Sequence, residues 1–203
     1  MNLKETYNRI AEDWVKDHDK DTWGIPGAET FLSFLPKGLS VLDVGCGGGI
    51  KTNYIASQGY IAAGVDLSEK MIEIAKREYP ELEFSVLDMY DIDKYPKTVD
   101  AIFVQAALLH IEKARAPEVL EKMKGKLNPD GLLYIAVKAK REDGVDEEVK
   151  TENDYGYEYQ RFFSYYTIDE LRAYFAELNF DIIWEGEANT NATRWLQIVG
   201  KKK

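Results

Sequence analysis

The sequence contains one cysteine, Cys46, among its 203 residues. A single cysteine cannot form an internal disulfide, and the N-terminal stretch MNLKETYNRIAEDW lacks the basic-then-apolar layout of a secretory signal, so we expect a protein of the reducing cytoplasm. Long apolar runs are also missing. The most apolar stretch, AIFVQAALLHI at residues 101–111, is far shorter than the roughly 20 residues that a membrane helix needs, so we expect no membrane partner.

Positive charge is scarce too, since the formal net charge is −10 and the pI about 4.8. An acidic chain repels nucleic-acid phosphates unless a basic patch is hidden in the fold, so we expect no nucleic-acid partner. The only histidines, His18 and His110, are isolated in the sequence, and no His, Cys and Asp cluster has metal-ligand spacing, so we expect no metal. The composition fits either a monomer or a homodimer.

What the sequence does contain is a regular alternation of short apolar runs and amphipathic stretches. This alternation is typical of an α/β fold, in which helices cover both faces of a parallel sheet. The clearest helix spans residues 167–178, where Thr167 and Glu170 form a capping box ahead of an apolar stripe. Seven strands are expected, at residues 39–45, 61–67, 82–88, 99–105, 131–138, 180–186 and 193–200.

The length suits one well-buried core rather than two. Before the first strand, Tyr7, Ile10, Ala11 and Trp14 fall on one helical face, which predicts an appended helix. Residues 139–160 carry eight acidic and three basic side chains and lengthen one connection unusually. We expect a single domain, 1–203, made of an N-terminal helical cap (1–36), a cofactor-binding core (39–138), an insertion or lid (139–166), and a C-terminal helix and strand pair (167–203).

The stretch VLDVGCGGGI follows the first expected strand and places four glycines among five positions. In an open parallel sheet the ligand lies beyond the carboxyl ends of the strands, where the first strand–helix turn must let backbone approach closely. Gly45, Gly47 and Gly49 provide such a turn. The fingerprint for nicotinamide dinucleotides needs a further glycine where Ile50 stands, so an oxidoreductase is disfavoured.

Acidic residues end the second and third expected strands as well. Asp66 lies where a carboxylate can accept hydrogen bonds from both hydroxyls of a ribose. Asp88 lies where an acceptor can take the amino group of adenine, with Met89 beside the ring. The alternatives are that Asp66 only caps the next helix, a role that Ser68 can also fill, and that the acceptor is one of the acids shortly after Asp88.

Five segments together, VLDVGCGGGI, GVDLSEKMIEIAK, VLDMYDI, VDAIFVQAALLHI and LNPDGLLYIAVK, resemble the class I S-adenosylmethionine-dependent methyltransferases, in particular small-molecule methyltransferase domains. The resemblance covers residues 39–138. It implies a Rossmann-like, doubly wound seven-stranded sheet of order 3-2-1-4-5-7-6 with strand 7 antiparallel. It also implies S-adenosylmethionine as the cofactor.

The resemblance assigns site residues by position. The loop from Gly45 to Gly49, with Cys46 inside it, and Asp43 would hold the methionine part of the cofactor. The ribose and adenine would lie at the ends of the second and third strands, and the methyl-transfer side at the end of the fourth. The cofactor-binding residues implied in this way are Asp43, Gly45, Cys46, Gly47, Gly49, Asp66, Leu67, Asp88, Met89, Gln105 and Ala106. Tyr7 and Trp14 of the N-terminal helix could also contact the cofactor, or they could only pack the helix against the fold.

The acceptor side is expected from the variable segments: the N-terminal helix, the insertion, and YEYQRFFSYYTIDEL. Arg161 and Tyr165 are the candidate substrate residues, although Arg161 could instead neutralise its acidic neighbours. The tyrosines at 155–159 alternate, which fits one strand face, an aromatic lid or a solvated loop. His110 is the one candidate base, and its alternative is to pack in a helix and hold the loop beneath the cofactor.

The predicted function is therefore methyl transfer from S-adenosylmethionine, by in-line displacement, to a small-molecule acceptor that the sequence does not identify. The second possibility is a non-catalytic subunit that senses S-adenosylmethionine or supports a partner. An aligned displacement on a sulfonium depends on positioning more than on a base, because alignment contributes about 7–11 kcal/mol whereas a base adds about 10²–10⁴-fold in rate.

Overall fold

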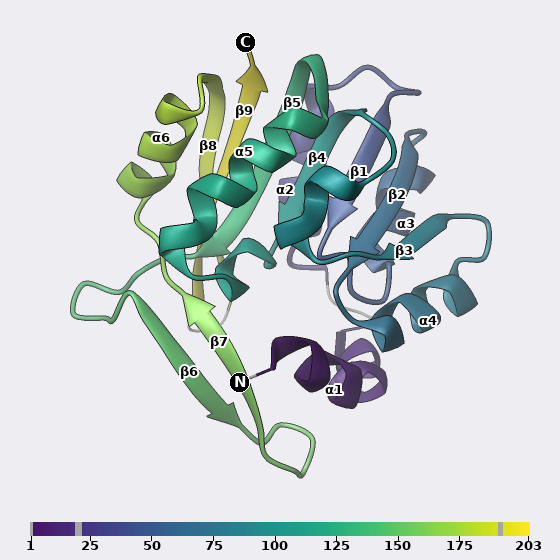
Figure 1. The fold of residues 1–203 in the computed structure, drawn as a ribbon, viewed down its shortest axis with the longest axis vertical. Coiled ribbons are helices and arrows are strands. Elements are labelled where there is room, and N and C mark those ends of the chain that lie inside the picture. The colour runs from purple at the N-terminus through teal and green to yellow at the C-terminus, as the bar shows by residue number, and fades with distance from the viewer. Residues whose placement is uncertain (1, 19–21, 191–192) are drawn as a thin grey trace.

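The protein is described by a computed structural model that covers residues 2–18, 22–190 and 193–203. Its centre is a seven-stranded sheet of order β3-β2-β1-β4-β5-β9-β8, in which only β9 runs antiparallel to its neighbours (Figure 1). The predicted doubly wound order is thus confirmed. The strands are β1 (Ser40–Val44), β2 (Ile61–Asp66), β3 (Glu83–Val86), β4 (Val99–Gln105), β5 (Leu127–Lys138), β8 (Phe180–Thr190) and β9 (Thr193–Lys202).

One strand begins earlier than predicted. Leu127 already pairs with Val99 of β4, ahead of the NPDG turn, and the register then shifts before pairing resumes at Leu132. Asp130 adopts a left-handed φ of 61° in this turn, which fits its role as an interruption inside β5 rather than a boundary before it. The strand was predicted from residue 131 on, and the pairing of Leu127 with Val99 was missed.

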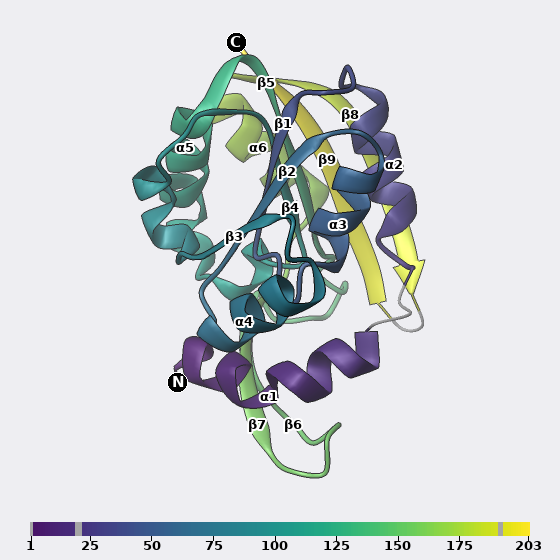
Figure 2. The same cartoon turned by 90° about the vertical axis from the view of Figure 1, so that its right-hand side faces the viewer.

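Helices cover both faces of the sheet, and Figure 2 shows α2 and α3 on one face and α5 and α6 on the other. Alternate residues of β1 point to opposite faces, so Leu42 packs in the core beneath α5 whereas Val41 packs with Phe31 of α2. The predicted capping box starts α6. The helices are α1 (Leu3–His18), α2 (Ile25–Ser33), α3 (Ile50–Ser57), α4 (Glu69–Glu78), α5 (Ala116–Lys126) and α6 (Ile168–Glu177), with 3₁₀ turns η1 (Met89–Lys94), η2 (Leu108–His110) and η3 (Lys113–Arg115).

The predicted N-terminal helix is α1, which lies against α4 near the carboxyl ends of the central strands (Figures 1 and 2). Its apolar face is the predicted one, since Ile10 and Ala11 are buried and Ala11 packs on Met71 and Ile74 of α4. Helix α1 is the longest of the described helices, and none of them is both long and apolar enough to cross a lipid bilayer.

The segment after β5 forms a separate hairpin of β6 (Glu147–Glu152) and β7 (Tyr159–Ser164), shown beside α1 in Figure 1. It adds no strand to the edge of the main sheet. Tyr155 and Tyr157 lie in its turn, and the Tyr155 ring stacks on Tyr159 at 5.5 Å between centroids. The Tyr157 hydroxyl donates to Asp13 of α1 at 2.7 Å, so the hairpin tip and the helix hold each other in place.

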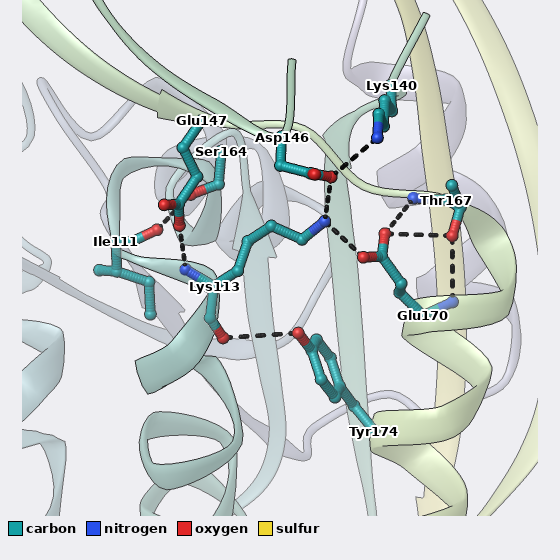
Figure 3. Close-up of polar contacts among 9 residues, drawn as sticks. All are labelled: Ile111, Lys113, Lys140, Asp146, Glu147, Ser164, Thr167, Glu170 and Tyr174. Atoms are coloured by element: carbon teal, nitrogen blue, oxygen red, sulfur yellow. Dashed lines mark hydrogen bonds and ion pairs between the residues drawn. The ribbon is translucent and has the colours of Figure 1, made fainter. Parts of the chain in front are cut away.

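The base of the hairpin is anchored by a cluster of charges, drawn in Figure 3. The Lys113 ammonium pairs with Asp146 at 3.0 Å and also with Glu170 of α6, and its backbone N–H donates to Glu147 at 2.6 Å. Ser164 donates from the last position of β7 to a backbone carbonyl next to η2. Because the Lys113 side chain is only 13% exposed, this cluster fixes the hairpin more firmly than a surface ion pair would.

Candidate functional site

A cavity of 780 Å³ opens at the carboxyl ends of β1 to β5, bounded by α1 and the hairpin. This is the edge where an open parallel sheet binds its ligands. The structure brings most of the predicted site residues into its wall, and the exceptions are Gly49 and Tyr165. The predicted residues that line the cavity are Tyr7, Trp14, Asp43, Gly45, Cys46, Gly47, Asp66, Leu67, Asp88, Met89, Gln105, Ala106, His110 and Arg161.

The glycine loop turns sharply from β1 into α3. The N–H groups of Gly45 and Cys46 both donate to the carbonyl of Val65, at 2.8 and 3.0 Å, which fixes the loop against the end of β2. Gly47 has a left-handed φ of 53°, and a Cβ added there would stand 3.3 Å from the Trp14 ring. Bare backbone at this position therefore faces the cavity beneath an aromatic side chain.

Gly49, by contrast, serves the fold. It is the N-cap residue of α3 with a φ of 86°, and a Cβ there would approach Phe84 within 2.8 Å. Its lack of a side chain lets α3 pack against the end of the sheet, and the expected contact of Gly49 with the cofactor stays a prediction. Cys46 is likewise a buried packing residue next to Phe84, and burial raises the pKa of its thiol.

Two buried carboxylates stand beside the loop. Asp43 is 2% exposed and accepts a hydrogen bond from the Thr52 hydroxyl at 2.7 Å. Asp66 accepts from the N–H of Gly47 at 3.0 Å and from the N–H of Ser68 at 2.9 Å. Burial raises the pKa of Asp43 to about 7 and that of Asp66 to about 6, so a cation or a hydroxyl placed between them would be bound favourably.

The question of which residue caps α4 is settled by the side-chain geometry. The Ser68 hydroxyl accepts the N–H of Met71 at 3.1 Å and is the N-cap. Asp66 uses one oxygen for the N–H of Ser68 and the other for the glycine loop, and each oxygen keeps a free lone pair. Its remaining acceptor capacity is thus available at the cavity wall.

Asp88 follows β3 and begins η1, where it accepts the N–H of Tyr90 at 3.0 Å. It lines the cavity with Met89, whereas the two acids after it do not. Asp91 pairs with Lys94 at 3.0 Å, and Asp93 lies 3.9 Å from Lys122. Of the three candidate acids after β3, only Asp88 is therefore placed to meet a ligand in the cavity.

At the end of β4 the backbone is strained, because Ala106 has a φ of 55°. A non-glycine residue in this conformation is uncommon and is often found at functional sites. The side chain of Gln105 donates to the carbonyl of Gly24 at 3.3 Å, which ties the start of α2 to this strand end. The Ala106 turn thus lies between the glycine loop and the part of the cavity formed by β5 and β9.

His110 is tied at both ring nitrogens. Its Nδ1 lies 2.7 Å from the carbonyl of Phe162, which can only accept, so Nδ1 carries the proton. Its Nε2 then accepts from the Tyr7 hydroxyl at 2.7 Å, and Tyr7 in turn accepts from Arg161 at 3.5 Å. Burial, with the nearby Arg161 and Lys138, lowers the pKa of His110 to about 3, so the neutral ring joins α1, η2 and β7.

The two predicted substrate residues have different outcomes. Arg161 lines the cavity but forms a bidentate pair with Glu152, at 2.6 and 2.7 Å, across the hairpin. Tyr165 lies outside the cavity wall, because its hydroxyl donates to Glu148 at 2.7 Å and its ring lies behind Phe163. Phe163 lines the cavity in its place.

Sequence reasoning missed several residues of the wall. Lys138 ends β5, and its register partner is Trp195, which the antiparallel β9 brings to the same edge. The position of Lys138 at a strand end was the available signal, whereas Trp195 and Phe163 reach the site only through tertiary pairing. Within residues 2–18, 22–190 and 193–203, no three His, Cys, Asp or Glu side chains are grouped so as to hold a metal ion.

Comparison with known proteins shows which proteins the chain is similar to. Residues 41–131 match the family model of the methyltransferase domain. The chain is 29% identical over 102 residues to a ubiquinone biosynthesis O-methyltransferase of Coxiella burnetii and 30% identical over 108 residues to that of Haemophilus ducreyi. These alignments cover 49% of this chain and 44% and 45% of the relatives, so the chain spans under half the length of the curated relatives it matches.

Solved structures extend the likeness to nearly the whole chain. The 1,6-didemethyltoxoflavin-N1-methyltransferase of Burkholderia thailandensis has a TM-score of 0.77 at 18% identity, covering 99% of this chain and 87% of that one. The magnesium protoporphyrin IX methyltransferase of Synechocystis has a TM-score of 0.76 at 16% identity, covering 99% and 98%. Residues 41–131 thus match the methyltransferase domain family, and the fold of the chain is similar to that of class I S-adenosylmethionine-dependent methyltransferases.

Proposed function

We propose that the protein transfers a methyl group from S-adenosylmethionine, by in-line displacement, to a small-molecule acceptor. The observation that carries this proposal is one cavity that joins two differently built ends. One end has the glycine loop and the carboxylates Asp43, Asp66 and Asp88, and the other has the Ala106 turn and the ends of β5 and β9. A binding-only protein needs the first end, whereas group transfer needs both.

The residues present fit the cofactor. Asp66 has acceptor capacity for the ribose hydroxyls, and Asp88 with Met89 offers an acceptor and an apolar surface for adenine. A side chain on Gly47 would press against the Trp14 ring, because its Cβ would stand 3.3 Å from that ring. Asp43 supplies a buried carboxylate near a methionine ammonium. When bound, the cofactor supplies an electrophilic methyl group on a sulfonium centre.

The protein then contributes alignment and exclusion of water. Helix α1 and the hairpin cover the cavity and are joined through His110, which accepts from Tyr7 of α1 and donates to the Phe162 carbonyl of β7, so an acceptor would be held on the far side of the Ala106 turn. Alignment of this kind contributes about 7–11 kcal/mol to a displacement. His110 is a positioning residue in this proposal, because its Nε2 already accepts from Tyr7.

Small acceptors are supported by the structural neighbours. The Burkholderia structure holds 1,6-didemethyltoxoflavin together with S-adenosylhomocysteine. The test is to incubate the purified protein with methyl-labelled S-adenosylmethionine and fractionated metabolite extract, and to follow label into small molecules. We expect label in an extractable product, absent with Asp66→Asn. Tight cofactor binding with no transfer to any fraction would instead favour a non-catalytic subunit.

A further inference from the structure

Lys138 is a charged residue at the end of the cavity opposite the cofactor carboxylates, near Arg161. It closes β5 and pairs in register with Trp195 of β9. Its ammonium lies over the Phe163 ring, 4.0 Å from the centroid, and 5.9 Å from the Trp195 ring. The function proposed above gives this cation no task.

No carboxylate neutralises Lys138 among the residues that the structure describes, where its ammonium makes no ion pair or hydrogen bond. The nearest carboxylates are engaged elsewhere, since Glu152 pairs with Arg161 and Glu148 accepts from Tyr165. The charges that act on Lys138 most strongly are two positive ones, Arg161 and Lys150, and two negative ones, Glu152 and Glu148. Their formal charges sum to zero. The positive charge of Lys138 is therefore uncompensated at the cavity wall.

A half-buried cation without a partner is costly unless something offsets the lost hydration. Burial and the neighbouring Arg161 lower the pKa of Lys138 to about 8, which is still above neutral pH, so the side chain is mostly charged. The Phe163 face compensates only in part, because the attraction between a cation and one ring is weaker than a full ion pair in a buried site. An anion in the cavity would supply the missing partner.

The walls around this cation are flat and apolar. Phe163 and Trp195 are buried, at 1% and 6% exposure, and Trp195 stacks on Trp23 with 4.3 Å between centroids. All three line the cavity. Aromatic walls favour a planar apolar body, and the ammonium above Phe163 favours a negative group at the edge of that body.

Resting on the proposed function, we propose that the methyl acceptor is an aromatic organic acid, whose carboxylate pairs with the Lys138 ammonium while its ring packs against the stacked pair of Trp23 and Trp195. The carboxylate would anchor the acceptor, and the group to be methylated would lie at another position of the ring, toward the Ala106 turn. Lys138 thus selects the substrate and does not take part in bond formation.

The test uses benzoate and benzamide, which have similar shapes and differ in charge, added to protein saturated with S-adenosylhomocysteine. Ligand-observed NMR titration gives both dissociation constants. We expect benzoate to bind roughly tenfold tighter than benzamide, as one charge-assisted contact allows. Lys138→Met should remove that preference and leave benzamide binding unchanged, and Lys138→Arg should retain most of it.

Lys140→Met is the matched control. It removes the same formal charge two residues further on, from a side chain that pairs with Asp146 outside the cavity wall. It should leave the preference for benzoate intact. Equal affinity of the wild type for the two probes, no binding of benzoate, or an undiminished preference in Lys138→Met would overturn the assignment. Failure of S-adenosylhomocysteine to bind the wild type would instead contradict the proposed function.

Discussion

Replacing Asp66 by asparagine tests the cofactor site most sharply, because the structure predicts a large loss of cofactor binding and only a small net change in folding stability. The carboxylate accepts from Gly47 and Ser68 and faces the cavity with its remaining lone pairs. Asparagine has nearly the same shape but only one acceptor oxygen and no charge. The variant therefore keeps the volume of the site while halving what it can accept.

The size of each effect follows from these contacts. A hydrogen bond to a charged group contributes about 1.5–3 kcal/mol, so losing one bond to the ribose should weaken S-adenosylmethionine binding roughly ten- to a hundredfold. Folding loses one backbone bond as well, costing about 1–3 kcal/mol. The variant also gains folding stability, because it has no carboxyl group to ionise. The folded pKa of Asp66, about 6, lies above the unfolded value of about 3.9, so its ionisation at neutral pH destabilises the wild type by about 3 kcal/mol.

These two effects on folding have opposite signs and should leave the free energy of unfolding within about 2 kcal/mol of wild type. Titration calorimetry with S-adenosylhomocysteine and urea unfolding measure the two quantities separately. Asp100→Asn is the matched control, since Asp100 accepts from Ser40 and Asn128 at the other end of β4. It should lose stability and keep its cofactor affinity. An unchanged affinity in Asp66→Asn would refute the assignment of the ribose site.

Three further predictions concern the carboxylate beside the loop, the histidine and the hairpin. The folded pKa of Asp43, about 7, is raised above its unfolded value, so its contribution to stability is present below about pH 4 and lost as pH rises through 7. Asp43→Asn should therefore remove up to about 4 kcal/mol of the pH dependence of the free energy of unfolding, measured from pH 4 to 8. Parallel curves for variant and wild type would contradict this. His110→Asn should lower kcat/KM about tenfold and keep the shape of the pH–rate profile near neutrality, because the pKa of His110 is about 3. If the variant instead lost an acidic limb of the profile near neutral pH, His110 would be a general base. Arg161→Met should destabilise the protein by about 1–3 kcal/mol, because it leaves Glu152 unpaired. Adding Glu152→Gln to this variant should recover most of the lost stability. No recovery would mean that the pair does not hold the hairpin.

The cofactor side of the site could be predicted because it depends on local rules. A glycine loop after one strand and acids at the ends of the next two must meet at one edge of a parallel sheet, whatever the rest of the chain does. Asp43, Asp66 and Asp88 therefore lie where the strand ends placed them. The packing role of Gly49 could not be predicted, because a glycine that lets a helix pack and a glycine that faces a ligand look alike in a sequence.

The acceptor side depends on pairings between distant segments. Trp195 reaches Lys138 only because β9 runs antiparallel to β5, and Phe163 reaches the cavity only because β7 folds back beside α1. Tyr165 lies one residue beyond β7, where strand alternation no longer determines which way a side chain points. Neither periodicity nor motif spacing contains this information, so these residues required the structure.

The most direct measurement of the central proposal is calorimetric titration of the wild-type protein with S-adenosylhomocysteine, repeated with NAD. We predict one site for S-adenosylhomocysteine, with a dissociation constant of about 1–100 μM, typical of the ligand concentrations at which enzymes work, and no saturable heat with NAD. We also predict that Asp66→Asn weakens this binding. Saturable binding of NAD with none of S-adenosylhomocysteine would contradict the assignment of the glycine loop and the three carboxylates to a methyltransferase site.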